Sequence, residues 1–441
     1  MTTLTRSLSR WAVVALALLS CSMGWAQRQA DSLHFIEGVV VRERFVSKDV
    51  IPAQTLSGRE LQRLSAVSVA DALRYFAGVQ IKDYGGIGGL KTVNIRSMGS
   101  QHVGVFYDGL QLGNAQNGQI DLGRFSLDNM ESVSIYNGQR STILQPAKSF
   151  ASAAALYMTT RRPDVSATKR DHLKASLKVG SFSTINPSLL WERRLSPSLD
   201  LSISSEYLYT SGRYSFSYKK KNGYDTTSIR HNGDVRSLRF EAGLFGRIDE
   251  GEWRAKAYLY RSERGYPGAF VREEPGKFKH EDRQWDTDLM AQGSLRKSFG
   301  RYTLLLNGKF AHDYLHYLSD PRLDVTTMYV NNHYYQQEAY LSSAHQLALT
   351  DSWRLALSSD LQYDLYAFAY PTRLTALTAL ASDFTYRGLK AQASLLHTYV
   401  HDWTKAKDGQ APEKSEWTPT FILSYKPWSQ HELSVRGFYK R

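Results

Sequence analysis

Most of this chain consists of long segments in which apolar and polar residues alternate. One face of the first such segment would carry Leu173, Ala175, Leu177 and Val179. The positions between them hold Lys174, Ser176 and Lys178. A period of two indicates a β-strand whose two faces meet different surroundings. Many of these runs exceed 10 residues, and a tilted strand needs about 9–11 residues to cross a bilayer. We therefore predict a mainly β fold with an antiparallel transmembrane β-barrel over residues 166–441. A soluble β-sandwich is the alternative.

The ends of these segments favour the barrel. Several apolar faces begin with an aromatic residue, as expected at a bilayer interface: Trp253, Trp285, Tyr302 and Trp353. Tight turns alternate with long polar loops near residues 212–233, 264–281 and 318–333, and outer-membrane barrels have short turns on one rim and long loops on the other. Residues 372–400 keep this alternation only if they split into two strands at Tyr386-Arg-Gly388.

The predicted number of strands does not fit a closed barrel. This reading gives about 13 strands between residues 171 and 441, and the last run ends mid-strand. An open barrel would leave unpaired backbone groups in lipid, each costing several kcal/mol. The expectation is therefore that the C-terminal part of the barrel lies outside this sequence.

Composition narrows the functional classes. The net charge of +13 is dispersed, with one notable cluster at Lys219-Lys-Lys221, so nucleic acid is not an expected partner. The sequence has no CxxC, HExxH, phosphate loop or nucleophile elbow. We predict no enzyme activity, no catalytic residue, no metal and no cofactor.

The N-terminus predicts export. Arg6 and Arg10 precede an apolar core, and Gly24-Trp-Ala26 provides a small-residue cleavage site. Residues 1–26 therefore have the form of a secretory signal peptide. The single cysteine, Cys21, lies within it and could alternatively become a lipidated N-terminus.

A short β-prone run, Ile36-Glu-Gly-Val-Val-Val-Arg42, follows in the polar leader at residues 27–42. Such a segment can pair with the sheet edge of another protein. It can equally be an edge strand of the next domain, and the residues alone leave both readings open.

Residues 43–165 have the pattern of a compact α+β domain. Helices are predicted at residues 56–64 and 68–76, and short strands at 79–81, 92–95, 103–107, 133–136 and 155–159. The turns at residues 85–89 and 113–118 are rich in glycine. They are either tips that touch a ligand or connectors that need positive φ.

Five short motifs in this domain resemble those of the plug domain of TonB-dependent outer-membrane receptors. In order along the chain they are Ser68-Val-Ala-Asp-Ala-Leu-Arg74, Ala77-Gly-Val79, Asn94-Ile-Arg96, Tyr107-Asp-Gly109, and Met130-Glu-Ser-Val133 with Asn137-Gly138. The resemblance covers residues 37–160, whereas the barrel is similar in pattern only. Two departures are Ser97, where glycine is common, and the run at residues 144–155, where the family usually has a glycine-rich segment. Family barrels have 22 strands, so about nine would be missing here.

The resemblance implies a bacterial outer-membrane location and energised uptake of a scarce ligand. TonB, with its inner-membrane energising complex, would be the protein partner, and outer-membrane lipid would surround the barrel. The short leader leaves no room for a signalling domain or for the extension of glycan importers, which favours a siderophore, haem or cobalamin as the ligand. A passive pore or adhesin is the alternative function.

The resemblance also suggests roles for individual residues. The TonB box would comprise Glu37, Gly38, Val39, Val40 and Val41. Arg96 would pair with carboxylates of the barrel wall and hold the plug in place, while Asp108 and Gly109 would form a structural turn. Ligand contacts would come from Tyr84, Gly85, Gly86, Gly88, Gly89, Asn114, Asn117, Arg213 and Tyr214.

Overall fold

The computed structural model describes residues 53–440, except for gaps at 65, 67, 85–86, 114–117, 220–222, 224, 268–280, 320–328, 367–371, 404–412 and 427–434. The predicted signal peptide and TonB box lie outside the described residues. All described residues belong to one compact unit that starts at residue 49. Among them, no helix is long and apolar enough to cross a membrane.

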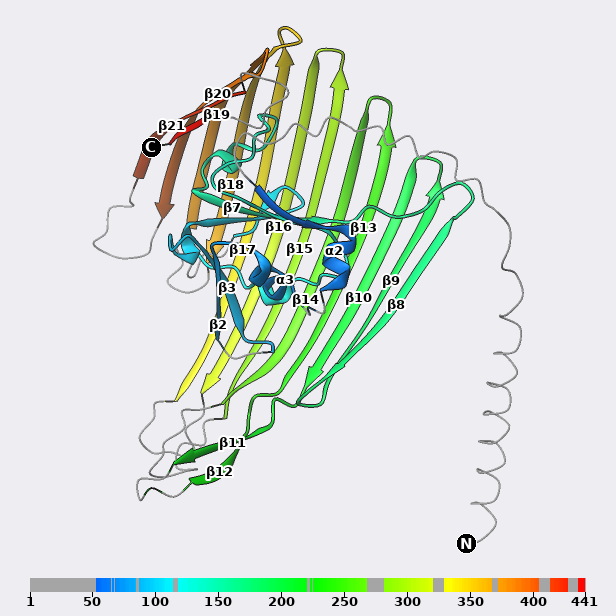
Figure 1. Ribbon diagram of the computed structural model, residues 1–441, viewed down its shortest axis with the longest axis vertical. Helices are drawn as coiled ribbons and strands as arrows, with labels where there is room; N and C mark the ends of the chain where they lie inside the picture. Colours follow the sequence, from blue (N-terminus) through cyan, green and yellow to red (C-terminus); the bar gives the residue numbers. More distant parts are fainter. Residues whose placement is uncertain are drawn as a thin grey trace. The chain divides into compact units, whose positions relative to one another are not determined.

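A 13-stranded antiparallel sheet, here called the wall, dominates this unit (Figure 1). Each strand pairs with its neighbours in sequence, apart from the two strands of a separate hairpin. Its strands are β8 (Asp171–Gly180), β9 (Thr184–Ser196), β10 (Leu199–Thr210), β13 (Val235–Ile248), β14 (Gly251–Pro267), β15 (Glu281–Phe299), β16 (Tyr302–Ser319), β17 (Val330–Ala348), β18 (Trp353–Tyr366), β19 (Thr372–Tyr386), β20 (Leu389–Trp403), β21 (Glu413–Tyr425) and β22 (Val435–Lys440). The predicted β class and the split of residues 372–400 at Arg387 and Gly388 are confirmed: β19 pairs with β20 across that turn.

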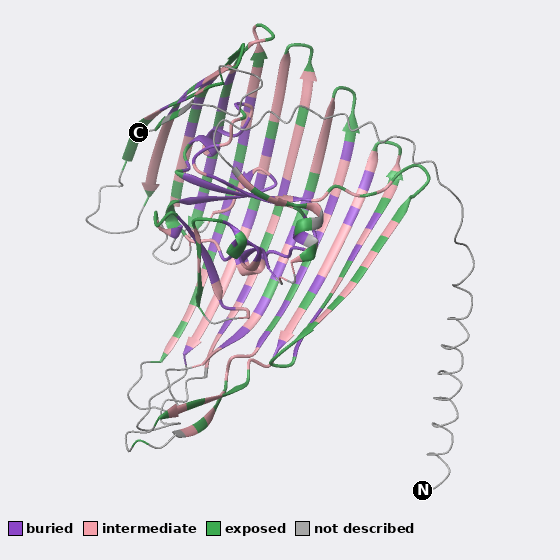
Figure 2. Ribbon diagram, viewed as in Figure 1, coloured by how far each residue is buried: buried purple, intermediate pink, exposed green. Residues whose placement is uncertain are grey.

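The two faces of the wall have an inverted polarity. Large apolar side chains stand on the exposed face, including Leu177 and Leu341, which are 65% and 66% exposed. The other face is buried yet charged, and carries Glu206, Arg239, Glu241, Lys256, Asp286, Lys309, Glu338 and Asp360. Figure 2 shows buried positions alternating with exposed ones along the same strands. The predicted alternation is therefore real, with its apolar side facing outward.

The N-terminal domain packs against the buried face of the wall. Its central sheet has the order β1-β6-β7-β4-β5, and β4 runs parallel to β7. These strands are β1 (Ala53–Ser57), β4 (Val103–Tyr107), β5 (Leu110–Gln111), β6 (Met130–Tyr136) and β7 (Ala154–Thr160), with β2 (Val79–Tyr84) and β3 (Leu90–Ile95) forming a separate hairpin. This α+β domain is the plug of the predicted fold class.

The helices of the plug are shorter than predicted. They are α2 (Gly58–Arg63), α3 (Val69–Ala72) and the 3₁₀ turns η1 (Leu73–Tyr75), η2 (Ser100–His102), η3 (Leu122–Arg124) and η4 (Ala147–Phe150). Residues 56 and 57 belong to β1, because Leu56 pairs with Val133 of β6 and this long-range pairing outweighs local helix propensity. Ser68 and Asp71 do form the expected capping box.

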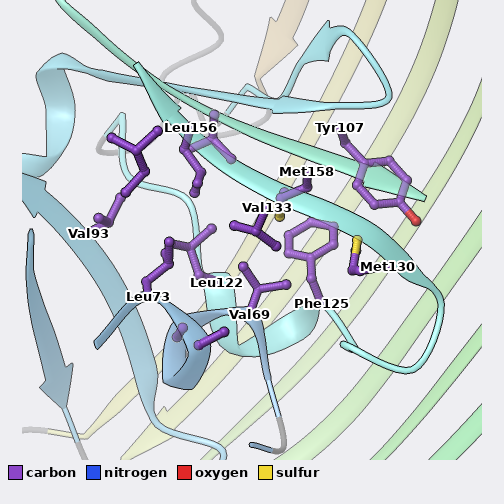
Figure 3. Close-up of a cluster of buried hydrophobic side chains, with 14 of the residues drawn as sticks. Val69, Leu73, Val93, Tyr107, Leu122, Phe125, Met130, Val133, Leu156 and Met158 are labelled. Carbon is purple, nitrogen blue, oxygen red and sulfur yellow. The ribbon is translucent and has the colours of Figure 1, made fainter. Parts of the chain in front are cut away.

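The core of the plug joins the small helices to the central sheet. Figure 3 shows Val69 and Leu73 from the helices, Leu122 and Phe125 from η3 and the residue after it, and Val133, Leu156 and Met158 from the strands around one interior. Tyr258 and Tyr260 of wall strand β14 join the same cluster. Burying a side chain of this size contributes about 1.5–3 kcal/mol, so the plug and the wall share part of one hydrophobic core.

A second difference from the prediction lies in the loop at residues 212–233. It contains an antiparallel hairpin of β11 (Tyr214–Lys219) and β12 (Asp225–Arg230). Tyr214, Phe216 and Tyr218 alternate with serines on β11 and form a row of neighbouring rings. The predicted long polar loop therefore contains a two-stranded sheet of its own.

Candidate functional site

The plug meets the wall first at the turn between β4 and β5. Asp108 and Gly109 both have positive φ, 51° and 88°, and Tyr107 pairs with Leu110 across them. Such two-residue turns favour Asp-Gly, because few residues tolerate positive φ. The Asp108 carboxylate accepts the backbone N–H of Thr160 at 2.9 Å and its hydroxyl. The turn thereby fixes a carboxylate on the side of the plug that faces β14.

A buried cluster of charges surrounds this carboxylate. Lys256 Nζ of β14 lies 2.8 Å from both Asp108 Oδ2 and Thr160 Oγ1 and 3.6 Å from a Glu241 oxygen of β13. Tyr107 donates its hydroxyl to Glu241 at 2.6 Å. The side chains of Lys256, Asp108 and Glu241 are at most 5% exposed. Each charge is therefore compensated by a group from the opposite domain. We call this set of side chains the Lys256 cluster.

The pKa of Asp108 gives the Lys256 cluster a predicted pH dependence. Burial would raise the pKa of Asp108, but the charges of Lys256 and Arg254 outweigh it and hold the pKa below the usual value. A lowered folded-state pKa contributes stability above the unfolded pKa, and this contribution is lost as the pH falls through the folded pKa. We expect hydrogen-exchange protection of β4 and β7 to weaken below about pH 3.9. An Asp108→Asn variant should be less protected at pH 7 and show a smaller acid-induced loss; equal losses in both proteins would contradict this assignment.

A second contact involves Arg124 of η3. Its guanidinium lies 3.2 Å from Asp286 Oδ1 and also contacts Asp288, both on β15. Arg264 of β14 contacts the same Asp286 at 2.7 Å and donates to the carbonyl of Gly88 at 2.5 Å. Bidentate and shared arginine–carboxylate pairs are directional, so this contact fixes the orientation of the plug as well as its position.

The role predicted for Arg96 stays a prediction. Arg96 lies at an exposed turn with φ 48°, and its backbone N–H bonds to Gly78. No ion pair is recorded for its side chain within the described residues. Among the described residues, Arg124 makes ion pairs with wall carboxylates of the kind predicted for Arg96.

A third contact holds the segment after β6 against strands β18 to β20. The backbone N–H of Lys148 bonds to Asp360 at 2.7 Å, and its ammonium contacts Gln362. Ser358 donates to the carbonyl of Gln145 at 2.7 Å. Around these bonds, a small apolar cluster joins Ile143, Ala147 and Phe150 of the plug to Ala356, Leu377, Ala379, Ala381 and Leu396 of the wall. The plug is thus attached to both halves of the described sheet.

A cavity of about 290 Å³ opens between the plug and the half of the wall that ends in long loops. Plug residues Leu112, Gly113 and Ile120 line one side. The wall lines the other with Tyr258, Tyr266, Gln284, Asp286, Asp288, Met290, Asp313, Tyr334 and Gln336. A mixture of aromatic rings and a few polar groups is typical of a small-molecule site. This is the candidate ligand cavity.

The residues predicted to bind ligand are only partly brought together. Gly113, which neighbours the predicted Asn114, lines the cavity, and a Cβ there would lie 2.5 Å from Glu338. Gly88 and Gly89 lie close to β14, since Arg264 bonds to Gly88, whereas Tyr84 is exposed at the end of β2. Arg213 and Tyr214 lie at the start of the β11–β12 hairpin. Gly85, Gly86, Asn114 and Asn117 lie outside the described residues.

Sequence reasoning missed the wall side of the site. Lys256, Glu241, Asp286 and Arg264 all occupy the polar positions of alternating strands, which were read collectively as one face. The available signal was their charge, because a charged residue inside a barrel needs a partner. The pattern could not show which plug residue supplies it, since the pairs join residues more than 100 positions apart.

Comparison with known proteins identifies the plug independently. A family model described as the TonB-dependent receptor plug domain matches residues 47–150. The vitamin B12 transporter BtuB of Vibrio vulnificus is 24% identical over 240 residues, which is 54% of this chain and 36% of that relative. The match therefore spans about a third of the relative's length.

Solved structures share the whole arrangement of plug and wall. The FrpB iron transporter of Neisseria meningitidis superposes with a TM-score of 0.71 at 12% identity, covering 89% of this chain and 64% of that one. The siderophore receptor PirA of Acinetobacter baumannii gives 0.62 at 11% identity, with 88% and 60% covered. The ferric yersiniabactin receptor FyuA of Yersinia pestis gives 0.57 at 14%, with 86% and 62% covered. These likenesses establish the fold.

Proposed function

Because this chain belongs to the TonB-dependent outer-membrane receptors, we propose that it takes part in the energised uptake of a scarce small ligand. The observation that carries the proposal is the plug itself. A folded domain is attached by buried ion pairs to the charged face of a large sheet. Such a domain obstructs the space beside the wall and must move before a ligand can pass.

The inverted polarity of the wall supports an outer-membrane location. Soluble monomers rarely expose apolar patches larger than a few hundred Å², yet apolar side chains such as Leu177, Leu341 and Leu380 cover the outward positions of many wall strands. Lipid is the surrounding that stabilises this face. The tight turns would then face the periplasm and the long loops the cell exterior.

The energy source in this proposal is TonB, with its inner-membrane complex. The segment Glu37–Val41 precedes the plug and is rich in β-branched residues, so it can add as a strand to the edge of another sheet. Force applied there would reach β1, the edge strand of the plug sheet. The plug contacts described above are the ones that such a force would have to break or shift.

The proposed ligand class is a siderophore, haem or cobalamin. The named activities of the relatives, vitamin B12 transport and iron or siderophore uptake, support this range. The cavity of about 290 Å³ beside the plug offers aromatic and polar groups for such a ligand. We propose no chemical reaction for this site, and a passive pore or adhesin remains the second candidate.

A growth screen tests the proposed function. A deletion strain would be grown with iron siderophores, haem or cobalamin as the limiting nutrient. We expect growth to fail on one of these sources and to return when the full-length gene is supplied. Equal growth of the deletion and parent strains on every source would contradict the proposal. Steady ion conductance of the purified protein in a planar bilayer would favour the passive pore instead.

A further inference from the structure

A second cavity, of about 500 Å³, lies between the plug and the half of the wall that ends in tight turns. We call it the turn-side cavity. On the plug side it is lined by the residues after β6 and β7, including Arg140, Gln145 and Arg162. On the wall side it is lined by Asp200, Phe245, Arg247, Glu252, Arg254, Ser294, Arg296, Leu305 and Asn307. Asp108 and Gly109 also line it, and none of its lining residues takes part in the ligand cavity described above.

The turn-side cavity carries an excess of positive charge. Five arginines line it against three carboxylates, those of Asp108, Asp200 and Glu252. Each carboxylate already has an arginine: Arg254 lies 3.3 Å from Asp108, Arg247 lies 3.1 Å from Asp200, and Arg162 lies 2.7 Å from Glu252. Arg140 and Arg296 remain. Within the described residues, no carboxylate is recorded in an ion pair with either of them.

The surroundings of Arg140 fix its position without neutralising it. Its guanidinium lies over the ring of Tyr157, 4.7 Å from the centroid, and 5.8 Å from that of Tyr136. Stacking of this kind orders the side chain and leaves its N–H groups free to donate at the edge of the plane. Arg296 of β15 lines the cavity from the wall side and is an exposed residue.

Two buried amides in the same cavity have unmet hydrogen-bonding capacity. Gln145 is 4% exposed, and neither its Nε2 nor its Oε1 has a partner among the described residues. Asn307 is 9% exposed, and its Nδ2 also has none there. Buried polar groups are nearly always hydrogen-bonded, because an unpaired one costs about 1–3 kcal/mol. These amide atoms have almost no surface open to the cavity, so they bear on the packing of its lining and not on an occupant.

From these observations we infer that the turn-side cavity binds a carboxylate or phosphate group of a small molecule. Two arginines that pair with no carboxylate among the described residues line one space. Both oxyanions accept several N–H bonds at once. The volume falls within the range of small-molecule pockets, about 300–1,000 Å³. A neutral apolar occupant would leave the two arginine charges unpaired.

This inference rests on the proposed function for its biological use. The ligand cavity lies towards the long loops and the turn-side cavity towards the tight turns, on opposite sides of the Lys256 cluster. A ligand that bears an anionic group would reach the turn-side cavity only after the plug has shifted. The second site would then hold the ligand on its way to the periplasm and disfavour its return.

Anion binding can be measured without any transport. We would titrate the full chain, purified in detergent, with citrate and with inorganic phosphate by calorimetry at low salt. Binding should occur in the native protein and weaken about tenfold or more in Arg296→Gln and in Arg140→Gln, since each removes charge-assisted hydrogen bonds. Arg301→Gln is the matched control, because Arg301 is an exposed arginine beside a tight turn that does not line the cavity. Absence of binding, or equal binding in all four proteins, would overturn the inference.

Uptake measurements show whether the bound anion is part of the transported ligand or a free anion. In cells that carry Arg296→Gln, uptake of a carboxylated ligand should fall several-fold, while its binding to the cell surface and the uptake of a neutral ligand stay unchanged. If uptake of both ligands is unchanged although citrate binding is weakened, the site holds a free anion such as phosphate. If the native protein transports nothing yet binds citrate, the proposed function fails while the anion site stands.

Discussion

Replacing Lys256 by methionine is expected to release the plug from β13 and β14. The substitution keeps the length of the side chain but removes the cation between Asp108 and Glu241, which stay buried. Arg254 is the cation that remains beside Asp108. Removing one partner from a buried ion pair typically costs about 3–5 kcal/mol, because the remaining charge loses its compensation. The loss should appear as faster hydrogen exchange in β4 and β7 of the full chain, and as a lower unfolding midpoint of the plug in denaturant.

Lys178→Met provides the matched control for this experiment. Lys178 also joins the wall to the plug, at 3.3 Å from Asp128, but the two side chains are 31% and 22% exposed. A pair that retains access to water is worth roughly 0–1 kcal/mol, so exchange in β4 and β7 should change little. If both variants loosened the plug equally, burial of the Lys256 cluster would not be the cause. Native hydrogen exchange of β4 and β7 in the Lys256→Met variant would show that the Lys256 cluster does not hold the plug.

The second large effect is expected from Val39→Pro in the proposed TonB box. Proline lacks the backbone N–H and cannot donate to a sheet, so a strand added at this position would lose its pairing. Accumulation of the ligand inside cells should fall by at least about tenfold, because loss of energised release leaves only slow leakage. Surface binding should stay at the native level, since residue 39 precedes the described plug. Uptake and surface binding of radiolabelled ligand on intact cells separate the two steps.

Val39→Thr is the control variant for that position. Threonine is β-branched, keeps its N–H and favours an extended backbone, so uptake should remain close to native. If Val39→Pro took up ligand at the native rate, TonB would either contact another segment or not take part in uptake. Equal loss in both variants would point to a side-chain contact and not to strand pairing.

Individual elements show which parts of the fold can be predicted from the sequence alone. The period of two predicted the strands of the wall, and the rule that short and long connections alternate correctly divided β19 from β20 at Arg387. Both signals are local. The capping box at Ser68 was predicted for the same reason, because a cap and its acidic partner lie three residues apart.

The sequence could not predict strand pairing or ion pairs between residues that lie far apart along the chain. Leu56 was assigned to a helix because its pairing with Val133 is invisible in the local pattern. Arg96 was chosen for the wall contact from a family motif, whereas the geometry of η3 brings Arg124 to Asp286. The turn-side cavity depends on Arg140 and Arg296, which are 156 positions apart by residue number and become neighbours of one space only in the fold.

The central claim is that the plug blocks passage until energy is supplied through its N-terminal segment. Its most direct test is the accumulation of radiolabelled ligand by cells that carry the full-length protein, with and without a protonophore that collapses the proton gradient. We predict unchanged binding at the cell surface in both conditions, and accumulation in the periplasm only while the gradient is present. Accumulation at the same rate without the gradient would contradict the claim and identify a passive pore.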